Sequence, residues 1–329
     1  MKKMIVLICL LFTFLPIQIF PQTFFGNEPL AHTFSIVARD AETGEMGVAV
    51  QSHWFSVGSI VAWGEAGVGV IATQSFVNPS FGPHGLDLLK QGKTAQEVVD
   101  ILIASDEGRD VRQLAIVDSK GNSASYTGAK CISEAGNIIG DNYSVQANMM
   151  LNNTVWGAMS KAFENSKGPL AERLITALEA AQNEGGDIRG KQSACLLVVR
   201  GTPTGNIWED RLIDLRVEDN PNPIIELKRL LKVHRAYDHM NAGDLAVEKN
   251  DMKLAMDEYN TAMKMFPENL EMKYWTAISL ANTGDVEKSL PMFKEIFEKD
   301  KNWKELTKRL IPVGLLTVDE KILEEIINQ

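Results

Sequence analysis

The chain has 329 residues, more than a single domain usually contains, so two domains are expected. Hydrophobic residues make up 45% of it and charged residues 23%, which is typical of globular proteins and excludes wholesale disorder. The formal net charge of −10 disfavours nucleic acid and anionic lipid as partners, because both are negatively charged.

The first 22 residues are typical of a secretion signal. Lys2 and Lys3 precede an unbroken apolar run over residues 4–14, and Pro16 ends that run. The run is too short to cross a bilayer of about 30 Å as a helix. We therefore expect residues 1–22 to be a signal peptide, the protein to be periplasmic or secreted, and no membrane span to remain after signal removal. A true membrane anchor is the alternative.

Strand patterns dominate the part of the chain that follows. The first predicted strand covers residues 33–39, and short turns join it to strands at 46–52, 59–63 and 68–74. Such a run of strands with short connections predicts a largely antiparallel sheet. Two helices are predicted over 83–105, the second capped by Thr94 with Glu97 as its capping-box partner.

The same order of strands and helices then repeats. The patterns predict a hairpin at 114–117 and 124–127, a strand at 143–150, helices at 155–165 and 170–183, and closing strands at 193–200 and 212–217. Helices that arrive in pairs argue against a doubly wound parallel sheet. Two stacked sheets with helices outside each would fit this order. We therefore predict an α+β protein whose residues 31–218 form a four-layer αββα sandwich.

A helical repeat is predicted in the C-terminal part. The Asn-Pro-Asn-Pro segment at 220–223 marks a boundary, and residues 219–235 are expected to contain a linker helix. Small and aromatic residues then recur at a spacing of 34, as in Ala255 and Tyr259 against Ser289 and Phe293. This period resembles that of tetratricopeptide repeats, so residues 236–329 are predicted to form an all-α helical domain. An unrelated stack of helical hairpins is the alternative.

The usual signatures of catalysis and cofactor binding do not occur in the sequence. It contains no Gly-x-Ser-x-Gly motif and no phosphate-binding loop that ends in Gly-Lys-Ser/Thr. The glycines at 67–72 superficially match a dinucleotide fingerprint, but a strand pattern follows them where a helix is required. The five histidines have no ligand spacing. We therefore expect no cofactor and no metal site.

Polar side chains gather instead at the ends of predicted strands. Taken singly, each cluster is also explained by ordinary turn chemistry. Together they could line one pocket at the end of the sandwich, and that convergence is our prediction. The candidate site residues are Thr33, Gln74, Asn78, Asn148, Asp187, Arg189, Gln192 and Ser193.

Residues 33 to about 231 resemble the domain of unknown function 1028 family nearly end to end. The resemblance is carried by the segments 33–40, 47–50, 66–69, 72–74, 78–83, 126–128, 168–174, 185–187, 189–190, 192–194 and 214–217. That family is similar in fold to the N-terminal-nucleophile (Ntn) hydrolases, which are αββα sandwiches. The resemblance therefore implies the same layer order that the paired helices predict independently.

The resemblance also implies a mechanism and a set of roles. In such hydrolases a Thr, Ser or Cys at the start of the first strand is the nucleophile, and its free α-amine is the base. Thr33 has the right type and place. Asn148 or Gln192 would stabilise the oxyanion, and Asp187 and Arg189 would orient the nucleophile or hold a substrate carboxylate. Gln74, Asn78, Arg189, Gln192 and Ser193 are then the substrate-binding candidates.

Two functional classes follow from these expectations. The first is an exported amidohydrolase of small amide or peptide-like substrates, which needs a second cleavage because signal removal near residue 22 leaves Thr33 inside the chain. The second is a catalytically inert sandwich whose repeats at 236–329 bind a protein or peptide partner. The chemical state of Thr33 distinguishes the two.

Overall fold

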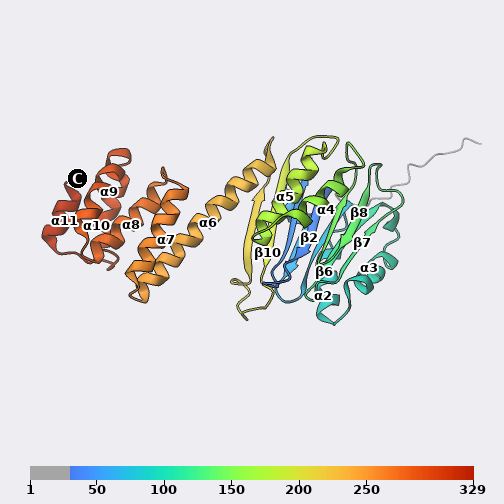
Figure 1. Ribbon diagram of the computed structural model, residues 1–329, viewed down its shortest axis with the longest axis horizontal. Helices are drawn as coiled ribbons and strands as arrows, with labels where there is room; N and C mark the ends of the chain where they lie inside the picture. The colour runs from blue at the N-terminus through green and yellow to red at the C-terminus, as the bar shows by residue number, and fades with distance from the viewer. Residues whose placement is uncertain (1–29) are drawn as a thin grey trace, which may run out of the picture.

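The computed structural model describes residues 30–329, and the predicted signal peptide at 1–22 lies outside these residues. Among the helices within 30–329, none is both long and apolar enough to cross a membrane. The described chain consists of an N-terminal part with two sheets and a C-terminal part made of helices (Figure 1).

The two sheets are antiparallel. The first sheet contains β1 (Leu30–Ala31), β4 (Ala62–Glu65), β5 (Gly69–Phe76), β6 (Arg112–Asp118) and β7 (Ser123–Thr127). The second sheet has the order β11 (Arg211–Val217), β10 (Ser193–Val199), β3 (Met46–Ser52), β2 (Thr33–Arg39), β9 (Tyr143–Ala147) and β8 (Gly136–Gly140). β2 lies between β3 and β9. Its first residue, Thr33, pairs with Ser52 of β3 and therefore lies inside the sheet and not at its edge.

A pair of helices covers the outer face of each sheet. α2 (Phe81–Lys90) and α3 (Ala95–Ala104) pack on the first sheet, and α4 (Val155–Asn165) and α5 (Leu170–Asn183) pack on the second (Figure 1). Side chains alternate along β2, so Phe34 and Ile36 face the helices whereas Val37 faces the other sheet. The predicted α+β class, with antiparallel sheets and a C-terminal helical region, is confirmed.

Several segments of the N-terminal part differ from the sequence prediction. A strand is predicted over 59–63, but the chain forms a short helix, α1 (Gly58–Val61), before β4 begins. An added Cβ on Gly58 would lie 2.6 Å from the Cβ of Cys195, so this turn approaches β10 more closely than other residues allow. Tertiary packing therefore overrides the strand pattern here. Another difference is β8, which the sequence does not predict because glycines closely bound its two isoleucines; a 3-10 turn (Arg109–Val111) also precedes β6.

A single long helix, α6 (Pro223–Glu248), joins the two parts of the molecule (Figure 1). Its first half contributes Leu227 and Leu231 to the core beside the second sheet. Its second half contributes Ala236 and Met240 to the core of the helical part. Each half is therefore held by a different core, and the helix continues past residue 235, the expected end of the linker.

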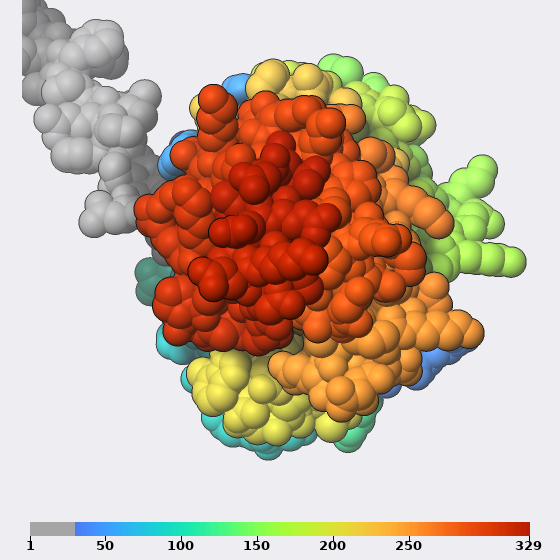
Figure 2. Space-filling model, turned by 90° about the vertical axis from the view of Figure 1, so that its left-hand side faces the viewer, coloured from blue at the N-terminus to red at the C-terminus, as the bar shows by residue number. Residues whose placement is uncertain are grey.

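The C-terminal helical part contains five more helices, which are α7 (Met252–Met265), α8 (Leu270–Asn282), α9 (Val286–Lys299), α10 (Asn302–Leu310) and α11 (Glu320–Ile327). Figure 2 looks onto this end of the molecule, where the C-terminal residues form the surface nearest the viewer. The small residues of the 34-residue pattern, Ala255 and Ser289, are fully buried, and so are the rings of Tyr259 and Phe293. Small side chains at these positions let neighbouring helices pack closely.

Enlarging Ala255 should therefore destabilise the helical part. We expect Ala255→Leu to cost about 1–3 kcal/mol, because a larger side chain overpacks a contact that has no free volume. Asn260→Leu, on the exposed face of the same helix, is the matched control and should change the free energy of unfolding by less than about 0.5 kcal/mol. Chemical denaturation followed by circular dichroism measures both, and equal stabilities for the two variants would contradict the packing.

Candidate functional site

A layer of polar side chains lies between the two sheets at the end where β2 begins. The alternation that points Val37 toward the first sheet also points Thr33 and Ser35 there. The facing strands add amide side chains to the same space. The complete layer is Thr33, Ser35, Gln74, Gln113, Gln146 and Asn148, and all six are fully buried.

Gln113 of β6 is the centre of this layer. Its Oε1 accepts hydrogen bonds from Gln74 Nε2 at 2.7 Å and from Asn148 Nδ2 at 2.8 Å. Its Nε2 donates to Thr127 Oγ1 and to the carbonyl oxygen of Ala147, both at 2.9 Å. Gln113 of the first sheet thus bonds to Ala147 in β9 of the second sheet and to Asn148, which follows β9. Buried amides that are paired in this way carry no desolvation penalty for unmet hydrogen bonds.

The same layer holds the backbone of Thr33. The Thr33 carbonyl oxygen accepts from Gln74 Nε2 at 3.2 Å and from Asn148 Nδ2 at 3.4 Å. Ser35 Oγ donates to Gln74 Oε1 at 2.6 Å and accepts from Gln146 Nε2 at 2.5 Å. These directional bonds fix where β2 begins, and Gln74 and Asn148, which the sequence predicted as site residues, act on Thr33 through its backbone.

The residues around Thr33 are also buried and bonded. The Thr33 hydroxyl donates to the carbonyl oxygen of Ala31 at 2.8 Å. The His32 ring is 2% exposed, bonds through Nδ1 to Asn148 Oδ1 at 2.9 Å, and meets the edge of Phe76 with 5.0 Å between ring centroids. Burial lowers the pKa of His32, and the charge of Arg189 adds to this, against the raising effect of the bond to Asn148. His32 is therefore neutral at pH 7.

Two donors converge on the carbonyl oxygen of His32, the group joined to the nitrogen of Thr33. Ser52 Oγ donates to it at 2.5 Å and Arg189 Nη2 at 2.8 Å. Asp187 holds Arg189 in place through two bonds, from Nε to Oδ1 at 3.0 Å and from Nη2 to Oδ2 at 2.7 Å. The Asp187 carboxylate is itself fixed by the backbone N–H of His53 at 3.1 Å. The His32–Thr33 peptide bond thus has a neutral and a charged donor on its oxygen.

Five of the eight predicted residues belong to this arrangement, and three lie elsewhere. Asn78 Nδ2 donates to Asp106 Oδ2 at 3.4 Å near the start of α2. Gln192 Nε2 donates to Asp219 Oδ1 at 3.3 Å. Ser193 Oγ donates to the Trp54 carbonyl oxygen and accepts from the backbone N–H of Val57.

The residues of this arrangement that are not among the eight candidates are His32, Ser35, Ser52, Gln113 and Gln146. The alternation of β6 could have identified Gln113, because it shares a face with Ala115 and Val117, which pack between the sheets. Gln146 stands in the same relation to Asn148. Ser52 ends the predicted strand 46–52 and so fits the strand-end pattern, although it is not among the eight candidates. No local pattern indicates the role of His32, which depends on Arg189, more than 130 positions away in the chain.

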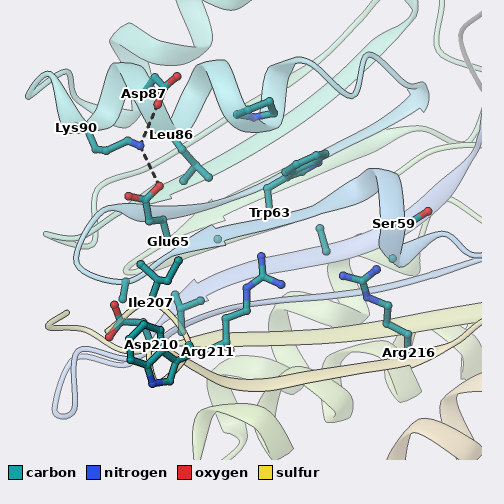
Figure 3. A pocket seen from close by; sticks show the side chains of 17 residues that line it. Ser59, Trp63, Glu65, Leu86, Asp87, Lys90, Ile207, Asp210, Arg211 and Arg216 are labelled. Carbon is teal, nitrogen blue, oxygen red and sulfur yellow. Dashed lines mark ion pairs between the residues drawn. The ribbon is translucent and has the colours of Figure 1, made fainter. Parts of the chain in front are cut away.

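A cavity of about 730 Å³ lies on other elements, between α1, β4 and α2 on one side and β11 on the other (Figure 3). Its lining includes Trp63, Lys90, Trp208 and Arg211, and none of the eight predicted residues. Within residues 30–329, no three His, Cys, Asp or Glu side chains are grouped so that they could hold a metal ion.

The N-terminal part of the chain matches a known protein family. The model of a family of unknown function, DUF1028, matches residues 33–227, and the chain belongs to that family. The chain is also similar to protein SPO2555 from Silicibacter pomeroyi, whose crystal structure is described with the same family model. The two are 33% identical, with a TM-score of 0.55 over 61% of this chain and 88% of the other. No curated protein matches.

The central position of Gln113 gives a prediction for stability. Gln113→Leu should cost about 3 kcal/mol or more, because it removes four buried hydrogen bonds, to Gln74, Asn148, Thr127 and the Ala147 carbonyl, at about 0.5–1.5 kcal/mol each. The control is Gln96→Leu, since Gln96 is exposed on α3 and bonds only to Asp100. Urea denaturation should leave the control within about 0.5 kcal/mol of the wild type. An equal loss for the two variants would show that the layer contributes nothing specific.

Proposed function

We propose that the N-terminal part is an N-terminal-nucleophile amidohydrolase that acts on small amide or peptide-like substrates through Thr33. The observation that carries the proposal is the pair of donors on the His32 carbonyl oxygen, next to the Thr33 hydroxyl. The four-layer αββα architecture of that hydrolase class is part of the proposal. Two helix pairs outside two stacked sheets support it, as does the position of Thr33 at the start of a central strand.

The first step of the proposed mechanism is self-cleavage of the His32–Thr33 bond. Thr33 Oγ attacks the His32 carbonyl carbon, and Ser52 and Arg189 stabilise the negative charge that develops on the oxygen. The C–N bond breaks as the nitrogen takes up a proton, which leaves His32 as an ester on the threonine oxygen. Water hydrolyses the ester to give a His32 carboxylate, the Thr33 hydroxyl and a free Thr33 α-amine.

The second step is turnover of a substrate amide. The α-amine of Thr33, with a reference pKa near 8, takes the proton of its own hydroxyl as Oγ attacks the substrate carbonyl. The oxyanion then lies where the His32 carbonyl oxygen lay, between Ser52 and Arg189. Asp187 is a positioning residue in this scheme, because it holds the guanidinium of Arg189. Gln74 and Asn148 are positioning residues too, since they hold the Thr33 carbonyl.

The strand pairing of the segment before Thr33 favours a peptide-like substrate. β1 pairs with the edge of β5, with Leu30 opposite Phe76 and Ala31 opposite Ser75. Once this segment leaves, the β5 edge offers the same backbone hydrogen bonds to an extended acyl chain. Export is part of the proposal, and it rests on the signal-like residues 1–22 alone.

A second candidate function is a protein- or peptide-binding module in the C-terminal helical part. The tetratricopeptide-like spacing of 34 residues motivates it. Two cavities, of about 160 and 210 Å³, both include Asp244 and Trp275 in their linings. An aromatic ring and a carboxylate that line the same cavities could anchor a peptide with a basic residue. This function is compatible with an inert sandwich and with an active one.

Variants of Thr33 test the enzymatic proposal. Thr33→Ala should abolish both self-cleavage and hydrolysis of N-acetyl-dipeptide 4-nitroanilides, while the loss of one hydrogen bond, from the hydroxyl to Ala31, lowers stability by only about 1 kcal/mol. Thr33→Ser should keep part of both activities, because the hydroxyl remains.

The matched control for these variants is Thr261→Ala. Thr261 also donates its hydroxyl to a backbone carbonyl, that of Asp257, but lies in the helical part. Its removal should leave the release of nitroaniline and the mass of the chain unchanged. Equal hydrolysis by Thr33→Ala and the wild type would rule out Thr33 as the nucleophile.

A further inference from the structure

The cavity beside β11 is a separate groove with its own chemistry. Its volume of about 730 Å³ lies within the range of small-molecule sites, roughly 300–1,000 Å³. Its walls come from α2 and β4 on one side and from β11 with the loop before it on the other (Figure 3). The buried residues around Thr33 contribute nothing to this lining, so the groove is not the hydrolytic site.

One wall of the groove is a fixed aromatic surface. The indole of Trp63 packs against α2, where an added Cβ on Gly82 would lie 2.3 Å from the ring. Its Nε1 donates to the carbonyl oxygen of Ile60 at 3.0 Å. The polar atom of Trp63 is therefore satisfied within the protein, and what remains for a ligand is the apolar face, continued by Leu86.

The rim of the groove exposes two large apolar side chains. Ile207 and Trp208 are 80% and 76% exposed, and both belong to the loop between β10 and β11 and to the groove lining. Adjacent exposed residues of this size beside an apolar wall are typical of a binding surface. A flat apolar group placed in the groove would be covered by Trp63 on one side and could be covered by Trp208 on the other.

The charges in the groove are unevenly paired. At one end Lys90 is bonded to two carboxylates, Glu65 at 3.1 Å and Asp87 at 2.9 Å, so negative charge is in excess there. At the other end Arg211 and Arg216 share one carboxylate, Asp214, at 2.8 and 3.0 Å. Two guanidinium groups have more N–H donors than one carboxylate accepts.

The side chains of both arginines extend across the groove. Figure 3 shows both guanidinium groups extending from β11 toward the Trp63 side of the groove. The charge of Glu218 also raises the pKa of Arg216, but less than the hydrogen bond and the charge of Asp214 do. The Asp210 carboxylate accepts hydrogen bonds from the backbone N–H and the hydroxyl of Thr204. Unused donors therefore face the groove at its arginine end.

We propose that this groove binds a small molecule with a flat apolar body and a carboxylate. The apolar body lies between Trp63 and Trp208, and the carboxylate accepts hydrogen bonds from Arg211 and Arg216. Planar guanidinium groups favour carboxylates because they can form two parallel charge-assisted bonds. The proposal is independent of the chemistry at Thr33.

Calorimetric titration with 2-naphthoate and with the uncharged 2-naphthamide tests this proposal. The naphthoate should bind at least about tenfold more tightly, the effect of one charge-assisted hydrogen bond. The double variant Arg211→Gln/Arg216→Gln should remove that difference, and Trp208→Ala should weaken the binding of both compounds. Arg229→Gln, which alters an exposed arginine paired with Glu226 on α6, is the matched control and should bind as the wild type does.

Three results would overturn the proposal. The first is equal affinity for the two compounds, and the second is naphthoate binding that survives the double variant unchanged. The third is no binding of either compound by the wild type; if sedimentation then shows a dimer that Trp208→Ala dissociates, a second copy of the chain covers the groove instead. Thr33→Ala should bind naphthoate normally, so that loss of hydrolysis and loss of this site are distinguishable.

Discussion

The position of Thr33 depends on the hydrogen bonds that Gln113 makes between the two sheets. The rest of the space between the sheets is filled by apolar side chains such as Val48, Val50 and Val70, whose attraction has no direction. Amide hydrogen bonds are directional, so the Gln113 bonds to Gln74 and Asn148 fix the relative position of β5, β6 and β9. Gln74 and Asn148 in turn hold the Thr33 carbonyl, so the backbone at the start of β2 is fixed.

The His32–Thr33 peptide bond is also held, by two hydrogen bonds to its carbonyl oxygen. Ser52 comes from the strand paired with β2, whereas Arg189 comes from the loop before β10 and is oriented by Asp187. A preorganised pair of donors stabilises negative charge better than mobile water does, because it does not have to reorient during the reaction. The same geometry serves the intact chain and, in the proposed enzyme, a substrate that replaces His32.

Much of the fold could be predicted from the sequence, because local patterns determine it. Paired helices and short hairpins indicated the α+β class, and the capping box at Thr94 and Glu97 is present. The length of α6 could not be predicted, since its two halves are stabilised by different cores. The turn at Gly58 depends likewise on contact with a distant strand.

The candidate site was predictable only in part. Polar residues at strand ends indicated Thr33, Gln74, Asn148, Asp187 and Arg189, and these are the ones that meet. Asn78 and Ser193 fit the same pattern but bond elsewhere, Asn78 to Ser80 and Ser193 to the backbone at Trp54 and Val57. Ser52 also ends a predicted strand, but its bond to the His32 carbonyl, like that of Arg189, joins segments far apart in the sequence, which no local pattern reports.

N-terminal sequencing of the exported protein tests the central claim most directly. If Thr33 is the nucleophile, the mature chain begins at Thr33, because only a free amine can act as the base. The Thr33→Ala protein should then begin earlier, at the signal cleavage point near residue 22. A wild-type chain that begins between residues 23 and 32, with Thr33 still acylated, would contradict the claim.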